Sequence, residues 1–234
     1  IKELRKYSKK PIKYLVISHR HFDHAYGIEV YIKKKATIFI DKTEYSYLKK
    51  EGPLINNLLT KNLGFNEDNI NFDNISDEKI NFLDDSIEVN LGNRRVLIKN
   101  LGIAHTKGDL IAYDFNTNTY ITGDVIFIGR AAAFSDANIP MWINVINNKL
   151  DLSWDYLIPG HGSIINNKLE LNDTKNWLYF LDNAAKQAVS EGDMISEIFQ
   201  YPIPKEIHHL KMKSITLRQG IKKQLDLYRK KYIE

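Results

Sequence analysis

Short apolar runs alternate with helical segments along most of the chain. The runs 12–18 (IKYLVIS) and 36–41 (ATIFID) have the length and composition of buried strands, and residues 24–35 between them have helical character. This strand, helix, strand order is typical of a βαβ unit. Residues 1–10 are predicted to be the end of a helix.

Strands dominate the middle of the sequence. Residues 86–102 predict a hairpin that turns at 92–93, and residues 109–124 predict a second hairpin that turns at 116–118. Residues 42–85 are polar and rich in asparagine. We interpret them as an excursion over the surface with two helical fragments, at 45–50 and 54–62.

Helical patterns return towards the C-terminus. Residues 140–150 predict a helix, and 155–162 predict a strand that runs into a Pro/Gly loop. Residues 172–192 predict a long helix that Asn172 or Asp173 caps and Gly192 ends. One or two further helices are expected after it, which makes the whole a layered α/β protein.

Composition narrows the class of protein. A chain of 234 residues with 43% hydrophobic content is long enough for one domain with a sizeable core. No apolar run approaches the roughly 18 residues of a membrane span, and no secretory signal is apparent, so we expect a soluble protein, cytoplasmic or periplasmic. The absence of cysteine excludes disulfides, a thiolate nucleophile and Cys-ligated zinc. Any metal must be bound by imidazole and carboxylate groups.

The charge is mildly positive but unevenly distributed. The net charge is +4, and residues 205–234 carry nine Lys/Arg against three acidic residues. We expect this segment to be the solvated face of a terminal helix rather than a surface for nucleic acid or membrane.

The stretch SHRHFDHAYG, residues 18–27, contains three of the seven histidines. Successive side chains alternate in an extended loop, so His19 and His21 can share one metal while Asp23 and His24 turn to a second. Three more residues of types that bind metals lie where predicted strands end in loops. Binding groups collect at such places on a sheet scaffold. The three residues are His105, Asp124 and His161.

The HRHFDH motif, followed in order by those three residues, resembles the metallo-β-lactamase superfamily over about residues 12–165. The sequences after His105 and Asp124 are more similar to the bacterial quinoprotein relay system and glyoxalase II-like branches. The resemblance implies an α/β fold, the four-layered αβ/βα sandwich, as a single domain of residues 1–234 with a helical C-terminal segment at 169–234. Family members usually have several strands before the motif, so we expect the first strands of the N-terminal sheet to be missing from the chain or supplied by another segment.

The resemblance also implies a dinuclear metal site. It assigns His19, His21 and His105 to the first metal and Asp23, His24 and His161 to the second, with Asp124 bridging both. Nitrogen and oxygen donors suit zinc best and also accept iron or manganese. Two Zn²⁺ ions would activate a bridging hydroxide, steered by Asp23 as the catalytic carboxylate, for hydrolysis of an ester, thioester or lactone of a small molecule.

Further residues are candidates for contact with the substrate. Tyr26 could donate to an oxyanion and Arg130 could bind a substrate carboxylate, although a structural role is the alternative for Tyr26. Trp142, with Phe134 and Met141, lines a pocket or packs in the core. His208 and His209 are expected at the surface, with a role as general acid as the alternative.

Other functions remain open. β-Lactamase activity is disfavoured because the resemblance puts Asp124 where the lactamase branches have Cys or Ser. A nucleic-acid phosphodiesterase would use the same metals, but neither a clamp domain nor an aromatic-interleaved basic motif is recognisable, so nucleic acid is not an expected partner. A di-iron redox protein generally has Glu at the position of His21 together with a flavin domain, and a complete ligand set argues against a metal-binding module without catalysis.

Overall fold

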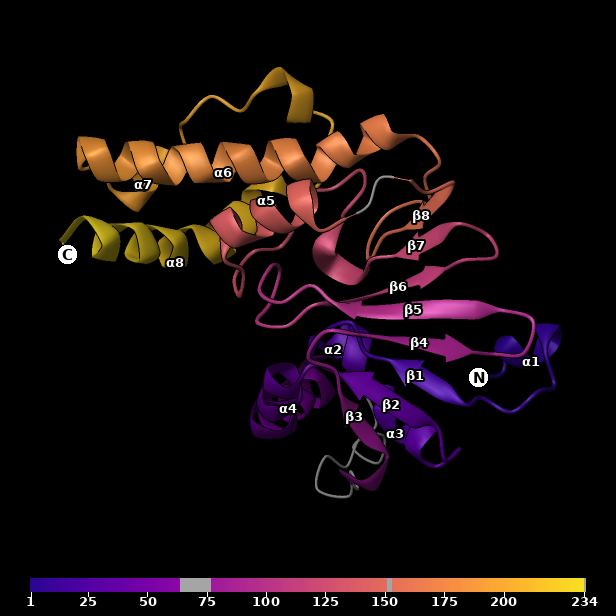
Figure 1. The fold of residues 1–234 in the computed structure, drawn as a ribbon. Helices are drawn as coiled ribbons and strands as arrows, with labels where there is room; N and C mark the ends of the chain where they lie inside the picture. Colours follow the sequence, from indigo (N-terminus) through magenta and orange to yellow (C-terminus); the bar gives the residue numbers. More distant parts are fainter. Residues whose placement is uncertain (64–76, 151–152, 234) are drawn as a thin grey trace. The chain divides into compact units, whose positions relative to one another are not determined.

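The computed structural model describes residues 1–63, 77–150 and 153–233, and these form two compact units, 1–84 and 85–234 (Figure 1). Each unit has its own sheet and its own cluster of buried hydrophobic side chains. The prediction of a mixed α/β fold, with sheets flanked by helices, is confirmed. No helix in the described part of the chain is both long and apolar enough to cross a membrane.

The first unit is built on a parallel sheet with the strand order β1-β2-β3. Two short helices connect β1 to β2, which confirms the predicted βαβ unit, since parallel neighbours need such a crossover. The sheet has three strands among the described residues. The elements of this unit are α1 (Leu4–Tyr7), β1 (Tyr14–Val16), α2 (Phe22–Ala25), α3 (Ile28–Ile32), β2 (Thr37–Ile40), α4 (Lys42–Leu63), η3 (Asp77–Lys79) and β3 (Ile80–Phe82).

The interpretation of residues 42–85 as a surface excursion is wrong for the parts that the structure describes. One helix, α4, spans both predicted fragments and includes Pro53. Tyr45 and Leu48 on this helix are buried in the core of the first unit, and β3 supplies the third strand. Tertiary packing of one helix face outweighs a polar composition with weak helical periodicity. Residues 64–76 of that segment lie outside the described residues.

The second unit is built on a five-stranded sheet with the order β4-β5-β6-β7-β8. The first four strands are antiparallel neighbours, which confirms both predicted hairpins, and β8 adds in parallel to β7. Gly92 and Asn118, at the two turns, have φ angles of +100° and +49°, which is why glycine and asparagine occur there. The strands are β4 (Ser86–Asn90), β5 (Arg95–Asn100), β6 (Leu110–Asp114), β7 (Thr119–Ile121) and β8 (Tyr156–Ile158).

Helices α5, α6 and α8 pack together in the second unit (Figure 1). The predicted long helix is confirmed as α6, which ends at Gly192 in a left-handed conformation. The predicted cap is wrong, because both Asn172 and Asp173 lie inside the helix and Asp173 instead accepts a hydrogen bond from the Gly129 backbone N–H. The elements are η4 (Gly123–Val125), α5 (Ile139–Asn148), η5 (Lys168–Leu171), α6 (Asn172–Glu191), α7 (Ile195–Ile198), η6 (Lys205–Ile207) and α8 (Lys213–Ile233).

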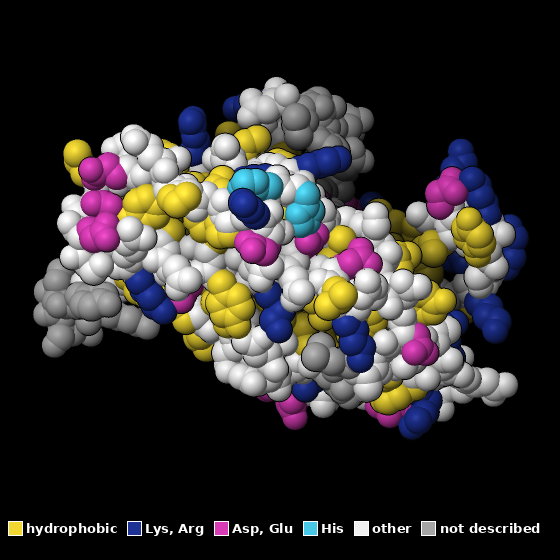
Figure 2. Space-filling view, turned by 90° about the horizontal axis from the view of Figure 1, so that it is seen from above, with side chains coloured by type: hydrophobic (Ala, Val, Ile, Leu, Met, Phe, Trp, Pro, Cys, Tyr) yellow, Lys and Arg dark blue, Asp and Glu magenta, His cyan; other side chains and the backbone are white. Residues whose placement is uncertain are grey.

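The basic C-terminal segment includes α8, which buries Ile221 and Leu225 and exposes Lys222 and Lys223. Lys222 pairs with Asp226 at 2.7 Å along the helix, and Lys223 lies 3.5 Å from Asp136. On the face of the molecule in Figure 2, lysine and arginine side chains stand among acidic and apolar ones rather than in one continuous patch.

Candidate metal centre

The first group of candidate ligands follows β1. The Ile17 N–H donates to the Phe39 carbonyl at 2.9 Å, so the ladder to β2 extends to the residue just before the histidine loop. The Ser18 hydroxyl then lies 3.1 Å from His19 Nδ1 and 3.3 Å from His24 Nδ1. This hydroxyl engages one nitrogen of each ring, which leaves both Nε2 atoms as the ligating positions.

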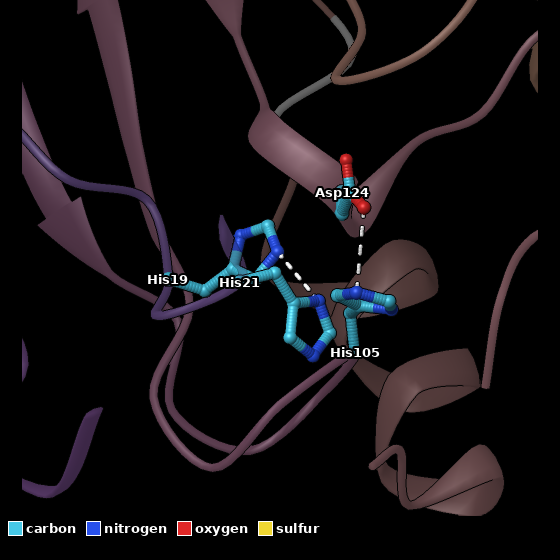
Figure 3. Close-up of side chains that lie close together, drawn as sticks. All are labelled: His19, His21, His105 and Asp124. Atoms are coloured by element: carbon cyan, nitrogen blue, oxygen red, sulfur yellow. Dashed lines mark hydrogen bonds and ion pairs between the residues drawn. The ribbon is translucent and has the colours of Figure 1, made fainter. Parts of the chain in front are cut away.

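His19 and His21 present their rings edge to face. His19 Nε2 lies 3.0 Å from His21 Nδ1, and the ring centroids are 4.6 Å apart (Figure 3). His19 is fully buried, so the nitrogen pair is held in a restricted environment. Two imidazole nitrogens that converge in this way are a suitable pair of ligands for one zinc ion.

Asp23 and His24 lie within the short helix α2, which begins at Phe22 with His21 at its N-terminal cap position. The carboxylate Oδ2 of Asp23 lies 3.6 Å from His24 Nε2. The Asp23 side chain is 38% exposed, whereas that of His24 is 15% exposed, so the carboxylate is the more accessible group of the two.

The second unit contributes His105 from the loop between β5 and β6. The Asp109 carboxylate accepts hydrogen bonds from the Thr106 N–H and hydroxyl, which closes this loop. The Nδ1 atom of His105 lies 3.0 Å from the Ala133 carbonyl. Because a carbonyl oxygen only accepts, Nδ1 carries a proton, and Nε2, which faces Asp124, is the nitrogen that can bind a metal.

Asp124 lies in η4, immediately after β7, and is almost completely buried. Its Oδ2 atom is 3.4 Å from His105 Nε2 and 3.6 Å from His161 Nε2 (Figure 3 draws the first of these). A Cβ atom on Gly160 would stand 2.0 Å from Asp124 Oδ1, so glycine at 160 is needed for the carboxylate to occupy this place.

Neighbouring side chains fix the rings of this second group. The Phe127 ring stacks on His161 with centroids 5.3 Å apart, and the Ile128 N–H donates to the His161 carbonyl at 2.9 Å. The buried Thr174 hydroxyl accepts a hydrogen bond from the Phe127 N–H at 2.9 Å and donates one to the Phe127 carbonyl at 2.7 Å. Helix α6 therefore holds the segment that supports His161.

The donor distances within each group fit a metal ion. Tetrahedral zinc with ligand bonds of about 2.0–2.1 Å separates its donor atoms by about 3.3 Å. The carboxylate-to-imidazole separations of 3.4 Å and 3.6 Å are longer than ordinary hydrogen bonds and close to this value. Histidine and aspartate side chains that could hold a metal thus occur in both units: His19, His21, Asp23 and His24 in the first, and His105, Asp124 and His161 in the second.

Comparison with known proteins decides the family. A sequence profile described as the metallo-beta-lactamase superfamily matches residues 1–180. The chain belongs to this superfamily. The superfamily consists of metal-dependent hydrolases, so the expectation of an enzyme of this class is confirmed. None of the curated proteins compared with the chain matches its sequence.

Solved structures of the superfamily share the fold. The metallo-beta-lactamase from Pontibacter korlensis is 15% identical, with a TM-score of 0.54, over 76% of this chain and 74% of that protein. Metallo-beta-lactamase IND-7 is 16% identical, with a TM-score of 0.58, over 76% and 73%. TMB-1 is 18% identical, with a TM-score of 0.53, over 75% and 70%. At such identities the similarity concerns the fold, which confirms the predicted superfamily sandwich.

The three residues predicted on the substrate side occupy different environments. Tyr26 is buried in the core of the first unit. Burial and the negative charge of Glu51 raise the pKa of Tyr26 to about 12, although the positive charge of Arg20 acts in the opposite direction. Trp142 is fully buried, donates its indole N–H to the Val125 carbonyl and lies with its ring centroid 5.2 Å from that of His105. The position of Trp142 favours a supporting role over contact with a substrate.

Arg130 is half-buried, with its guanidinium carbon 5.8 Å from the centroid of the Phe127 ring, and its role towards a substrate stays a prediction. Of the other suggested pocket residues, Phe134 is buried in the core and Met141 is exposed. His208 and His209 are both exposed, as expected: the first lies 2.8 Å from the Ile203 carbonyl and the second 2.8 Å from the Asp173 carboxylate.

The groups that hold the ligands in place were not predicted from the sequence. Ala133 offers only a backbone carbonyl, which leaves no signal in a sequence. Thr174 and Glu44 act from distant helices, and neither belongs to a recognisable motif of the site. The Asp-x-x-Glu spacing of residues 41–44 indicates a helix start but not the target of the Glu44 carboxylate.

Proposed function

We propose that the chain is a dinuclear zinc hydrolase that cleaves an ester, thioester or lactone bond of a small molecule. In this proposal Asp124 would be shared between the two ions. The observation that carries the proposal is the shared oxygen Oδ2 of Asp124, which faces Nε2 of both His105 and His161 at 3.4 and 3.6 Å.

The motif order supports the division of ligands between two ions. His19, His21 and His105 would hold the first ion, whereas Asp23, His24 and His161 would hold the second. All seven ligands are nitrogen or oxygen donors, which suit zinc and also accept iron or manganese.

Two bound Zn²⁺ ions would lower the pKa of a water molecule enough to provide hydroxide near neutral pH, and would polarise the oxygen of the scissile group. The protein supplies the orientation. Asp23, the more exposed carboxylate, would accept a hydrogen bond from the attacking water and direct it towards the substrate. The Ala133 carbonyl keeps the proton of His105 on Nδ1, so that the Nε2 lone pair stays available.

The carboxylate at position 124 supports an ester, thioester or lactone substrate over a β-lactam. In the resemblance described above, lactamase branches have Cys or Ser here, whereas the thioesterase, lactonase and glyoxalase II-like branches have a carboxylate. The structural neighbours are metallo-beta-lactamases in name, but at 15–18% identity they support only the fold. A cephalosporin therefore belongs in the substrate panel as the competing outcome.

The variant Asp124→Asn tests the proposal. It keeps the side-chain volume but removes a negative charge shared by two dications, so we expect one ion to be lost and turnover to fall at least about 10- to 100-fold. The measurement is metal content by elemental analysis together with hydrolysis of an ester, thioester, lactone, cephalosporin and phosphodiester panel.

Asp155→Asn, at an exposed aspartate of the same unit, is the matched control and should change neither quantity. An Asp124→Asn protein that keeps both metals and full turnover would rule out a bridging carboxylate at this position.

A further inference from the structure

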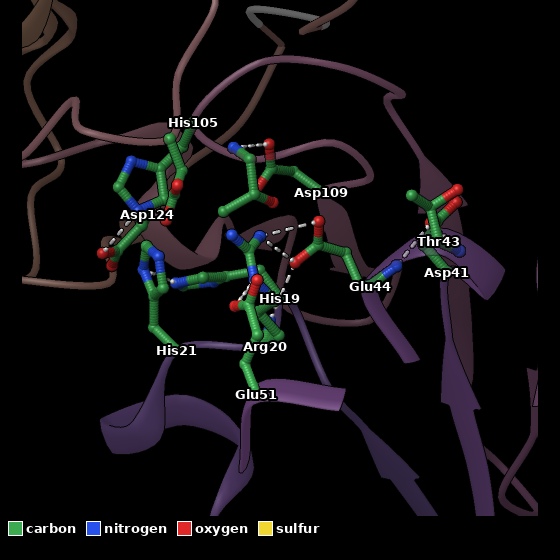
Figure 4. A network of polar contacts seen from close by, with 12 residues as sticks. His19, Arg20, His21, Asp41, Thr43, Glu44, Glu51, His105, Asp109 and Asp124 are labelled. Carbon is green, nitrogen blue, oxygen red and sulfur yellow. Dashed lines mark hydrogen bonds and ion pairs between the residues drawn. The ribbon is translucent and has the colours of Figure 1, made fainter. Parts of the chain in front are cut away.

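A buried ion pair lies beside the first histidine group. Arg20 stands between His19 and His21 in the sequence, and its side chain is only 8% exposed. Its guanidinium Nη1 donates to both carboxylate oxygens of Glu44, at 3.2 and 3.1 Å, and the Glu44 side chain is fully buried (Figure 4).

Stability alone is a poor explanation for this pair. Removing two charges from water is costly, and apolar residues of similar volume often stabilise a protein as well as or better than a buried ion pair. The Glu44 carboxylate has a second contact, however, because its Oε2 atom accepts the Arg20 backbone N–H at 3.1 Å. That N–H belongs to the peptide unit between His19 and Arg20.

Helix α4 holds Glu44 in a fixed position. The Asp41 carboxylate accepts hydrogen bonds from the backbone N–H groups of Thr43 and Glu44, at 2.7 and 3.0 Å, at the start of this helix. Tyr45 and Leu48, on the following turns, are anchored in the core of the first unit. The anchor for the histidine loop is therefore a rigid helix end.

The arginine is itself enclosed by α4. Its Nε atom lies 3.4 Å from Glu51, and its Cζ atom lies 4.8 Å from the centroid of the Tyr47 ring. The guanidinium thereby neutralises a carboxylate that also accepts a hydrogen bond from the main chain.

We propose that Glu44 is a positioning residue that fixes the backbone at residue 20, so that His19 Nε2 and His21 Nδ1 converge on the position of one metal ion. Arg20 serves as the counter-charge that allows a carboxylate to be buried there. The relevance to catalysis rests on the proposed function, since it requires these two histidines to bind metal.

Two double variants separate positioning from stability. Arg20→Met/Glu44→Gln removes both charges but keeps an acceptor for the residue 20 N–H, whereas Arg20→Met/Glu44→Leu removes the charges and the acceptor together. Glu51→Gln is the control, because Glu51 contacts the same guanidinium without contacting the backbone N–H.

The first measurement is the imidazole ¹⁵N spectrum of the metal-free proteins, with thermal unfolding midpoints recorded in parallel. We expect wild type, the control and the Gln variant to share one set of His19 and His21 signals. The Leu variant should show shifted or multiple signals for these rings. Equal signals in the two double variants would overturn the proposal whether or not the wild type binds metal.

The second measurement is zinc affinity, by competition with a chromophoric chelator. We expect the Leu variant to bind about 10- to 100-fold more weakly than the Gln variant. If the Leu variant does not fold, a folded Gln variant whose His19 and His21 signals differ from those of the wild type would overturn the proposal. A wild type that takes up no zinc refutes the proposed function but leaves the ring comparison decisive for Glu44.

Discussion

At the scale of single residues, Gly160 leaves the space that Asp124 occupies. A Cβ atom there would lie 2.0 Å from Asp124 Oδ1 and 2.7 Å from the Gly123 carbonyl carbon. We predict that Gly160→Ala destabilises the fold by about 1–3 kcal/mol, as overpacking does, and displaces the Asp124 carboxylate. Chemical denaturation and metal titration measure the two effects.

The matched control is Gly27→Ala. Gly27 has a φ of −80° and nothing within 4 Å of an added Cβ, so alanine should leave stability unchanged or raise it by about 0.4–1 kcal/mol. If Gly160→Ala behaves like this control, the close packing around Asp124 is not required.

The sequence was informative about these residues where chemistry restricts the choice of side chain. All seven proposed ligands follow from residue type and from their place after strands or in loops. Their supports could not be predicted, because the Ala133 carbonyl is common to every residue type and the Glu44 contact depends on how α4 packs. Trp142 illustrates the ambiguity: its position after Asp124 suited a pocket wall, but its full burial against His105 suits a support.

At the scale of elements, α6 is tied to the segment beside His161 by Thr174. Replacing Thr174 with Val removes a donor and an acceptor at once, and leaves the N–H and carbonyl of Phe127 without these bonds in a buried place. We predict a loss of about 1–3 kcal/mol in the free energy of unfolding for each group left unpaired, together with weaker metal binding.

Thr174→Ser retains the hydroxyl and should recover most of both quantities. The comparison by urea denaturation and zinc titration therefore separates the hydroxyl from the methyl group. A loss for the Ser variant without a loss for the Val variant would mean that packing of the methyl group, and not these hydrogen bonds, holds the segment.

Elements with strong local signals were predicted well. The two hairpins have turn residues suited to positive φ, and α6 has a clear apolar face and a glycine stop. Helix α4 lacks such signals, because its sequence is polar and includes Pro53. Its length is explained by the packing of its side chains in the core of the first unit. Asp173 resembles a helix cap in the sequence, but its carboxylate accepts a hydrogen bond from the backbone N–H of Gly129, which is remote along the chain.

At the scale of the whole molecule, the proposed centre needs seven ligands that are spread over residues 19–161 of the chain. Superfamily membership over residues 1–180 covers every one of these positions. The central claim is that one chain binds two metal ions and that Asp124 is required for both to be retained.

Native mass spectrometry of the metal-saturated protein tests that claim most directly. A chain of 27.2 kDa should carry two zinc ions, and Asp124→Asn should carry one under the same conditions. A folded wild-type chain that carries a single ion, or none, after saturation with zinc would contradict the dinuclear account.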